Sequence, residues 1–201
     1  MVALVTIEGL TKRFPKQAEP ALRSVSTQIR SGHIVGLVGP DGSGKTTFLR
    51  LIAGLLRADE GGIDVGGFDP VANAKEVRAR IAYMPQRFGL YEDLSVEENL
   101  NLYADLRGLV GSARKATFER LLDFTGLAPF TGRLAGALSG GMKQKLGLAC
   151  ALVVTPELLL LDEPSVGVDS ISPRRLRLLV RRRIHVCHPT AAPHPSYHAP
   201  A

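Results

Sequence analysis

The sequence predicts an α/β fold built on a largely parallel sheet with helices on its faces. Strand-like apolar runs alternate with helix-like runs along most of the 201 residues, and this alternation is typical of parallel sheets. A glycine-rich segment, Gly39–Thr47, lies between one such strand and one such helix. The run Leu158–Leu161 indicates a buried strand followed by two acidic residues. A chain of this length can form one good core and a subdomain, but not two full domains.

The first part of the chain predicts strands around turns. Val2–Glu8 and Ala21–Arg30 have the pattern of half-buried strands, and the turn-rich sequence FPKQAEP separates them. His33–Val38 is a short apolar strand that ends at the glycine-rich segment. Lys45–Leu56 has a helical pattern, which the sequence RADEGG ends.

The second part alternates helices with short apolar strands. Ser95 is expected to begin a helix, because Glu98 three residues later completes a capping box and the apolar positions that follow share one face. The helical insert between Gln86 and Leu138 is expected to form a side subdomain. In chain order, the expected elements are a strand at Ile63–Val65, a helix at Ala74–Arg80, a strand at Ile81–Met84, helices from Ser95, at Ser112–Phe124 and at Gly140–Val154, and a strand at Leu158–Leu161.

The glycine-rich segment is predicted to bind phosphate, because GPDGSGKTT fits the phosphate-loop pattern G-x-x-x-x-G-K-[ST]. A glycine loop followed by a helix turns several backbone N–H groups and the positive helix end toward one point. Lys45 is expected to neutralise the phosphates, and the Thr46 hydroxyl to bind magnesium. The position between a buried strand and a helix disfavours a purely structural loop. The residues expected to bind nucleotide here are Gly39, Pro40, Asp41, Gly42, Ser43, Gly44, Lys45, Thr46 and Thr47.

The two acids after Leu158–Leu161 are predicted to complete a hydrolytic site. Strand ends in open α/β sheets point at the ligand crevice, so Asp162 can reach a magnesium ion. Glu163 follows directly and is expected to polarise the water that attacks the γ-phosphate. A solvated corner is the alternative, which the four leucines before the pair and the proline after it disfavour. Together with the phosphate loop, the pair predicts ATP and Mg²⁺ as cofactors and hydrolysis of ATP.

The sequence LSGGMKQ predicts a second anion-binding helix start. Ser139, Gly140 and Gly141 open a helix, where backbone N–H groups and the helix dipole favour an anion. An ordinary N-cap is the alternative, since serine is common there. One ATP is not easily gripped by both glycine-rich segments of one chain. Two such domains facing head to tail, each completing the other's site, are the natural solution.

These three motifs together resemble the ATP-binding domain of ABC transporters, of the drug-exporter type with Gly-Pro-Asp-Gly in its phosphate loop. The resemblance covers about Val5–Asp169. It implies a P-loop NTPase (RecA-like) core with an antiparallel β subdomain and a helical signature subdomain. The domain is then expected to span residues 1–169, with the helical subdomain at about 87–138.

The resemblance also implies roles for three further residues. Phe14 in LTKRF stands where the family has an aromatic residue that stacks on adenine; core packing is the alternative for it. Gln86 in YMPQRFGLY matches the glutamine that touches the magnesium site and couples it to the membrane partner. Asp169 in SVGVD matches the loop that crosses the dimer interface. The expected catalytic residues are Glu163, Lys45 and Gln86, and the expected metal ligands are Thr46, Gln86 and Asp162.

The partners that the resemblance implies are a transmembrane permease subunit, docked on Phe88–Glu98, and a second ABC ATP-binding domain, identical or paralogous. The expected location is cytoplasmic, on the inner face of the cell membrane. No apolar run reaches the roughly 18–20 uncharged residues of a membrane span, and the N-terminus lacks the layout of a signal peptide. Cys150 and Cys187 have no metal or disulfide spacing, which favours a reduced, cytosolic protein.

Residues Ser170–Ala201 depart from the family pattern as an atypical basic, proline- and histidine-rich tail. The tail holds six arginines and no acid, which equals the whole formal excess of +6, so no nucleic-acid partner is expected for the body. Pro173–Val186 has a basic helical pattern, and no strand is expected after it. The tail histidines, none of which is expected to act as the family's γ-phosphate histidine, are His185, His188, His194 and His198. We interpret the tail as a truncation or a change of reading frame just after Val168–Ile171, which the downstream DNA would test.

Three interpretations of function remain open at this point. The leading one is an energy-coupling ATPase subunit of an exporter, which the coupling-region sequence YEDLSVEENLNLYADL favours. The second is a soluble ABC-type ATPase that acts on ribosomes or translation. The third is a truncated remnant that binds nucleotide with little hydrolysis, since the family's later strand and histidine are not expected here. Binding of lipid or nucleic acid by the basic tail is a weaker alternative.

Overall fold

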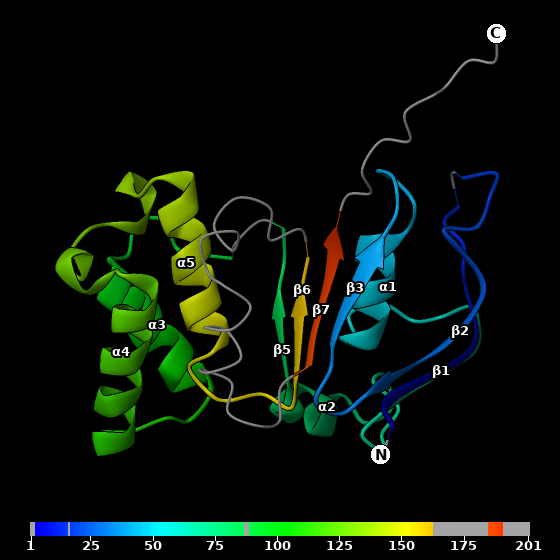
Figure 1. Ribbon diagram of the computed structural model, residues 1–201, viewed down its shortest axis with the longest axis horizontal. Helices are drawn as coiled ribbons and strands as arrows, with labels where there is room; N and C mark the ends of the chain where they lie inside the picture. The colour runs from blue at the N-terminus through cyan, green and yellow to red at the C-terminus, as the bar shows by residue number, and fades with distance from the viewer. Residues whose placement is uncertain (1–2, 16, 87–88, 163–184, 191–201) are drawn as a thin grey trace, which may run out of the picture.

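The structure is a computed structural model, and it describes residues 3–15, 17–86, 89–162 and, for the backbone, 185–190. An antiparallel sheet lies at one side of the molecule, a parallel sheet in the middle, and helices α3, α4 and α5 at the other side (Figure 1). The predicted fold class, an α/β core with an antiparallel β subdomain and a helical subdomain, is confirmed.

Among the described residues, the antiparallel sheet has three strands in the order β2-β1-β4. Strand β1 (Ala3–Lys12) lies in the centre, where Thr6 pairs with Gln28 of β2 (Leu22–Arg30) on one side and with Asp64 of β4 (Glu60–Val65) on the other. Strands β1 and β4 are both longer than the sequence pattern predicts. Each β1 pairing has a register shift near the end of the clear alternation, and pairing resumes beyond it, as far as Lys12 with β2 and Thr11 with β4.

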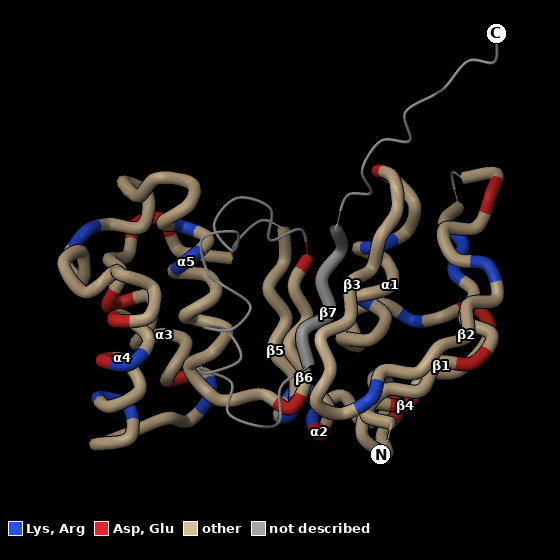
Figure 2. The backbone as a smooth tube through the Cα atoms, viewed as in Figure 1, with Lys and Arg blue, Asp and Glu red and all other residues tan. Residues whose placement is uncertain are grey.

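In the part of the chain that the structure describes, the parallel sheet has four strands in the order β3-β7-β6-β5. Strands β3 (Ile34–Val38), β5 (Ile81–Met84) and β6 (Leu158–Leu161) have nearly the predicted bounds. They contain no charged residue (Figure 2). Because neighbouring strands are parallel, their carboxyl ends meet at one edge of the sheet, where the phosphate loop and Asp162 follow.

Strand β6 joins the two hydrophobic cores that the described residues form. All four of its leucines are fully buried. Leu158 and Leu160 belong to the core that contains α1, whereas Leu159 and Leu161 belong to the core of helices α3 to α5. Side chains alternate between the faces of a strand, so burial on both faces requires four apolar residues in succession. This packing holds the strand end before Asp162 firmly in place.

The helices largely match their predicted positions. Ser95 caps α3 (Val96–Leu106) through the expected capping box with Glu98. The expected end of the first helix at Leu56 is wrong, because bonds from Ala53 and Gly54 to the preceding turn close α1 at Ile52. The helices are α1 (Lys45–Ile52), α2 (Ala74–Arg80), α3 (Val96–Leu106), α4 (Gly111–Thr125) and α5 (Gly140–Ala151), with short 3-10 turns η1 (Ala128–Phe130) and η2 (Ala135–Ala137). Within the described ranges, no helix has the length and apolarity needed to cross a membrane.

The prediction that no strand follows residue 186 is wrong. Strand β7 (His185–Thr190) pairs in parallel with β3 on one side and with β6 on the other. The sequence HVCHPT lacks the apolar alternation of a strand, but pairing depends on backbone groups, and β3 and β6 offer them on both sides. His185 and Val186, predicted as the end of a helix, are therefore strand residues. The rest of that predicted helix, together with His194 and His198, lies outside the described residues.

Candidate functional site

The phosphate loop is fixed by its glycine at the start of α1. Gly44 has a φ of 89°, the left-handed conformation, and a Cβ at this position would lie 2.3 Å from the Ala21 carbonyl oxygen. Any other residue is therefore strained and crowded there. The loop closes through hydrogen bonds from the Ser43 N–H to the Pro40 carbonyl (3.2 Å) and from the Phe48 N–H to the Gly44 carbonyl (2.9 Å).

Lys45 directs its charge into this loop. Its side chain leaves the first turn of α1, and the residue is only 8% exposed. The ammonium donates hydrogen bonds to the carbonyls of Gly39 (2.9 Å) and Pro40 (2.8 Å). The loop residues Asp41, Gly42 and Ser43 are exposed around it. A cation thus lies where a phosphate chain would enter.

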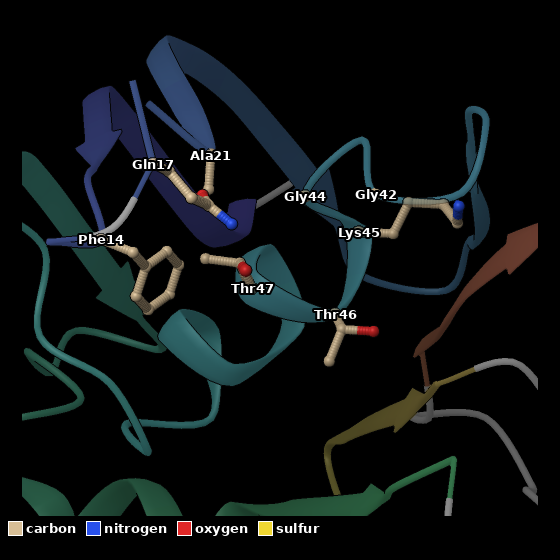
Figure 3. Close-up of a pocket in the computed structure, with 8 residues that line it drawn as sticks. All are labelled: Phe14, Gln17, Ala21, Gly42, Gly44, Lys45, Thr46 and Thr47. Carbon is tan, nitrogen blue, oxygen red and sulfur yellow. The ribbon is translucent and has the colours of Figure 1, made fainter. Parts of the chain in front are cut away.

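Thr46 and Asp162 meet although 116 positions separate them. The Thr46 hydroxyl donates to Asp162 Oδ1 at 2.8 Å, and the Asp162 backbone N–H donates to the Met84 carbonyl at 3.0 Å. Asp162 is 2% exposed, so its carboxylate requires such partners. Figure 3 shows the Thr46 side chain directed away from Phe14.

Tyr83 is a part of this site that the sequence analysis missed. Its hydroxyl donates to Asp162 Oδ2 at 3.0 Å. Burial raises the pKa of Tyr83 above its ordinary value, the negative charge of Asp162 raises it further, and a hydrogen bond with Arg50 lowers it. Tyr83 lies on β5 next to β6, so knowledge of the strand order would have indicated the contact.

Phe14 lines the same cavity as the phosphate loop. The cavity has a volume of about 210 Å³, and Phe14 is half-buried at one end of it, beyond Thr47 (Figure 3). The remaining lining residues are Gln17, Ala21, Gly42, Gly44, Lys45 and Thr46. A planar aromatic group and a phosphate-binding loop in one cavity match the two ends of a nucleotide.

The segment LSGGMKQ, Leu138–Gln144, here called the signature segment, opens α5 but lies apart from this cavity. The Ser139 hydroxyl accepts a hydrogen bond from the Met142 N–H at 3.3 Å and so caps the helix. Ser139 and Gly140 are exposed, and Gly141 is half-buried. In Figure 1, the parallel sheet lies between α5 and α1. Neither Ser139 nor the two glycines line the cavity that holds Lys45.

Of three further predicted site residues, Gln86 is the one that lies within the described part of the chain. Gln86 follows β5 by two positions and is exposed, at the edge where Asp162 follows β6. Glu163 and Asp169 lie outside the described residues, so their roles stay predictions.

The oxygen atoms of Thr46 and Asp162 fit a magnesium ion. Magnesium prefers oxygen ligands and is usually bound by one or two protein groups together with substrate phosphates. Among the described residues no cluster of three or more His, Cys, Asp or Glu could hold a metal alone. A hydroxyl and a carboxylate beside a phosphate loop therefore match a metal that arrives with its nucleotide.

The chain is similar to known proteins in sequence and in fold. The family model described as "ABC transporter" matches residues 22–166. The chain is 62% identical over 178 residues to "Probable multidrug ABC transporter ATP-binding protein YbhF" of Escherichia coli (strain K12), covering 89% of this chain and 31% of YbhF. It is 37% identical over 182 residues to "ABC transporter ATP-binding protein NatA" of Bacillus subtilis (strain 168), covering 89% of this chain and 74% of NatA.

The match to YbhF covers most of this chain but less than a third of YbhF. The chain spans 31% of the length of YbhF, so it corresponds to part of that protein. A matched span of 178 residues, 89% of this chain, is longer than residues 1–169 and so extends beyond Asp169. "Doxorubicin resistance ATP-binding protein DrrA" of Mycobacterium tuberculosis (strain CDC 1551 / Oshkosh) is 38% identical over 165 residues, covering 82% of this chain and 50% of DrrA.

Solved structures share the fold. "Structure of ATP binding subunit of ABC transporter" superimposes with a TM-score of 0.84 at 28% identity, covering 94% of this chain and 79% of that one. "Dimeric structure of a post-hydrolysis state of the ATP-binding cassette MJ0796 bound to ADP and Pi" gives a TM-score of 0.79 at 26% identity, covering 92% of this chain and 87% of that one.

Proposed function

This chain belongs to the ABC transporter family, and we propose that it is an ATP-binding subunit that hydrolyses MgATP to power export by a membrane transporter. The hydrogen bond of 2.8 Å between Thr46 and Asp162 carries the proposal, because it joins the phosphate loop to the strand-end carboxylate. The relatives named for multidrug transport and doxorubicin resistance support export as the process.

Different residues of the site are proposed to bind the phosphates, to hold magnesium and to activate the attacking water. Backbone N–H groups at the start of α1 favour the phosphates, and Lys45 would exchange its two carbonyl acceptors for phosphate oxygens, which are stronger partners because both groups are charged. Thr46 and Asp162 are the residues that would hold magnesium, with Gln86 at the same edge. Bound there, magnesium would neutralise charge on the phosphates. Glu163 is the proposed base that accepts a proton from the attacking water.

A second ATP-binding domain is the proposed partner for the signature segment. Ser139, Gly140 and Gly141 begin a helix that can bind an anion, yet they do not line the cavity around Lys45. A head-to-tail pair of domains would bring this segment to the nucleotide of the other domain. The related dimer with bound ADP and Pi supports such an arrangement.

A transmembrane permease subunit is the proposed partner for the segment at residues 89–98, a loop that runs into the first turn of α3. Asn99 is fully buried, and its side-chain amide holds this loop through hydrogen bonds with Tyr91, Leu94 and Ser95. The loop also bonds to residues 131–137, which lead into the signature segment. A rigid loop joined to that segment suits a docking surface. The chain would then act at the inner face of the cell membrane.

The activity is tested by measuring MgATP binding and phosphate release by the whole chain. Glu163→Gln is the matched variant, since it keeps the size of the side chain and removes the base. We expect equal MgATP affinity, and phosphate release at least roughly a hundredfold lower in the variant. Phosphate release by the unaltered chain that does not exceed that of Glu163→Gln would contradict hydrolysis. Co-purification with ribosomes instead of a multi-span membrane protein would contradict the export role.

A further inference from the structure

One carboxylate holds the segment that presents Phe14. Asp59 lies in the connection between α1 and β4, and its side chain accepts hydrogen bonds from the Arg13 N–H at 2.6 Å and from Lys12 Nζ at 2.9 Å. Its own backbone N–H donates to the Thr11 carbonyl at 3.0 Å. Asp59 therefore contacts three consecutive residues, and Phe14 is the next one in the chain.

Lys12 connects this carboxylate to the aromatic ring. The Lys12 ammonium lies 5.7 Å from the centroid of the Phe14 ring, within the range of a cation–π interaction. The side chain of Lys12 is only 15% exposed. An ammonium bound to Asp59 and close to the ring restricts the orientations that the ring can adopt.

Packing in a hydrophobic core does not fix Phe14. Over the ranges that the structure describes, neither of the two cores includes it. Phe14 lines the cavity of about 210 Å³ beside the phosphate loop and also a second cavity of about 390 Å³, which Asp59 lines as well. A ring beside so much open space takes its position from the backbone that carries it, and Asp59 holds that backbone.

We propose that Asp59 is a positioning residue for nucleotide recognition, which holds the Phe14 ring through Lys12 and Arg13 where a nucleotide base can stack on it. The inference rests on the proposed function, in which the phosphate loop binds the other end of the nucleotide. The Asp59 side chain is 38% exposed, so its ion pair with Lys12 is partly solvated and contributes little to folding stability. The consequence of losing Asp59 therefore falls on recognition of the base rather than on the fold.

Two ligands distinguish the contribution of the base to binding affinity from that of the phosphates. Titration calorimetry with the whole chain compares MgATP with magnesium tripolyphosphate, which carries phosphates but no base. Phe14→Ala sets the scale and is expected to weaken MgATP roughly tenfold, the size of a lost base–aromatic stack. Asp59→Ala is expected to weaken it about fivefold, and Asp59→Asn about threefold, because the amide oxygen still accepts from the Arg13 N–H. Tripolyphosphate affinity should change less than about twofold in all three variants.

Matched variants make the outcome decisive. Glu60→Gln removes the same charge at the neighbouring exposed position and is expected to bind both ligands as the unaltered chain does. Lys12→Met leaves Asp59 in place and is expected to weaken binding of MgATP about as much as Asp59→Asn does. If Asp59→Ala does not fold, this variant tests the positioning role in its place. An equal loss for both ligands, or no loss of MgATP affinity, overturns the positioning role. If tripolyphosphate does not bind the unaltered chain, the proposed function fails instead.

Discussion

The two glycine-rich segments of this chain both begin a helix, but they differ in how many partners they have among the residues that the structure describes. At α1, the Lys45 ammonium binds two loop carbonyls, and the Thr46 hydroxyl binds Asp162. At α5, Ser139 makes one capping hydrogen bond and remains exposed together with Gly140. The first segment is thus preorganised by its own fold, whereas the second offers its N–H groups outward, as a surface for another molecule does.

The glycines of the two segments show the same difference. Gly44 is required by its own chain, since its φ of 89° and the nearby Ala21 carbonyl exclude a side chain. Gly141 has ordinary helical backbone, and a Cβ there would meet no atom of the described residues within 4 Å. Nothing in the described fold requires glycine at Gly141, and the absence of a side chain there leaves the backbone of this first turn open to close approach by another molecule.

Gly141→Asp is expected to have the largest effect, on hydrolysis alone. The carboxylate would stabilise the first turn of α5 but repel the phosphates of a nucleotide bound to a second copy of the chain. Phosphate release should fall at least roughly a hundredfold, while MgATP affinity measured on the dilute chain stays unchanged. Gly141→Ala is the neutral control, expected to keep most of the activity. Hydrolysis by Gly141→Asp at the unaltered rate would show that no phosphate approaches α5.

Gly44→Ala is expected to act on the fold instead. Left-handed backbone and the contact of 2.3 Å with the Ala21 carbonyl together should lower the free energy of unfolding by about 3 kcal/mol. Urea denaturation measures this loss.

Gly42→Ala is the matched control for Gly44→Ala. Gly42 has a φ of 76° but no atom within 4 Å of the added Cβ, so it should lose only about 1 kcal/mol. Equal losses at the two positions would mean that the Ala21 carbonyl does not constrain the loop.

The sequence predicts well the parts of the molecule that depend on local pattern. Four consecutive leucines gave a strand buried on both faces, and Ser95 with Glu98 gave a capping box. The position of the phosphate loop between its strand and its helix was also predicted correctly, because it depends on local pattern.

The missed parts depend on contacts between residues far apart in the chain. Asp59 binds Lys12 across 47 positions, and Tyr83 binds Asp162 across 79. Neither residue carries a local signal for its partner. Strand β7 was missed because its place is set by the unfilled backbone groups of β3 and β6 and not by an apolar alternation of its own.

Tyr83→Phe tests how much the hydrogen bond from the Tyr83 hydroxyl to Asp162 stabilises the site at α1. The substitution removes one of the two side-chain hydrogen bonds that the described residues make to the buried Asp162 carboxylate. A hydrogen bond to a charged group contributes about 1.5 kcal/mol or more, so the free energy of unfolding at neutral pH should fall by about that amount. An unchanged value would mean that the Tyr83 hydroxyl does not support Asp162.

The pH dependence of the same variant is the smallest and most specific effect. The pKa of Tyr83 is raised in the folded chain above its ordinary value of 10.0, mainly by burial and further by Asp162. The stabilisation from this shift is therefore complete below pH 10 and is lost as the pH rises from there through the folded pKa, because only the unfolded state releases the proton in that range. The unaltered chain should lose stability more steeply than Tyr83→Phe above pH 10. In a spectroscopic titration of the four tyrosines, the variant should lack one late-ionising group, while Tyr103, whose pKa burial also raises, remains as the internal reference.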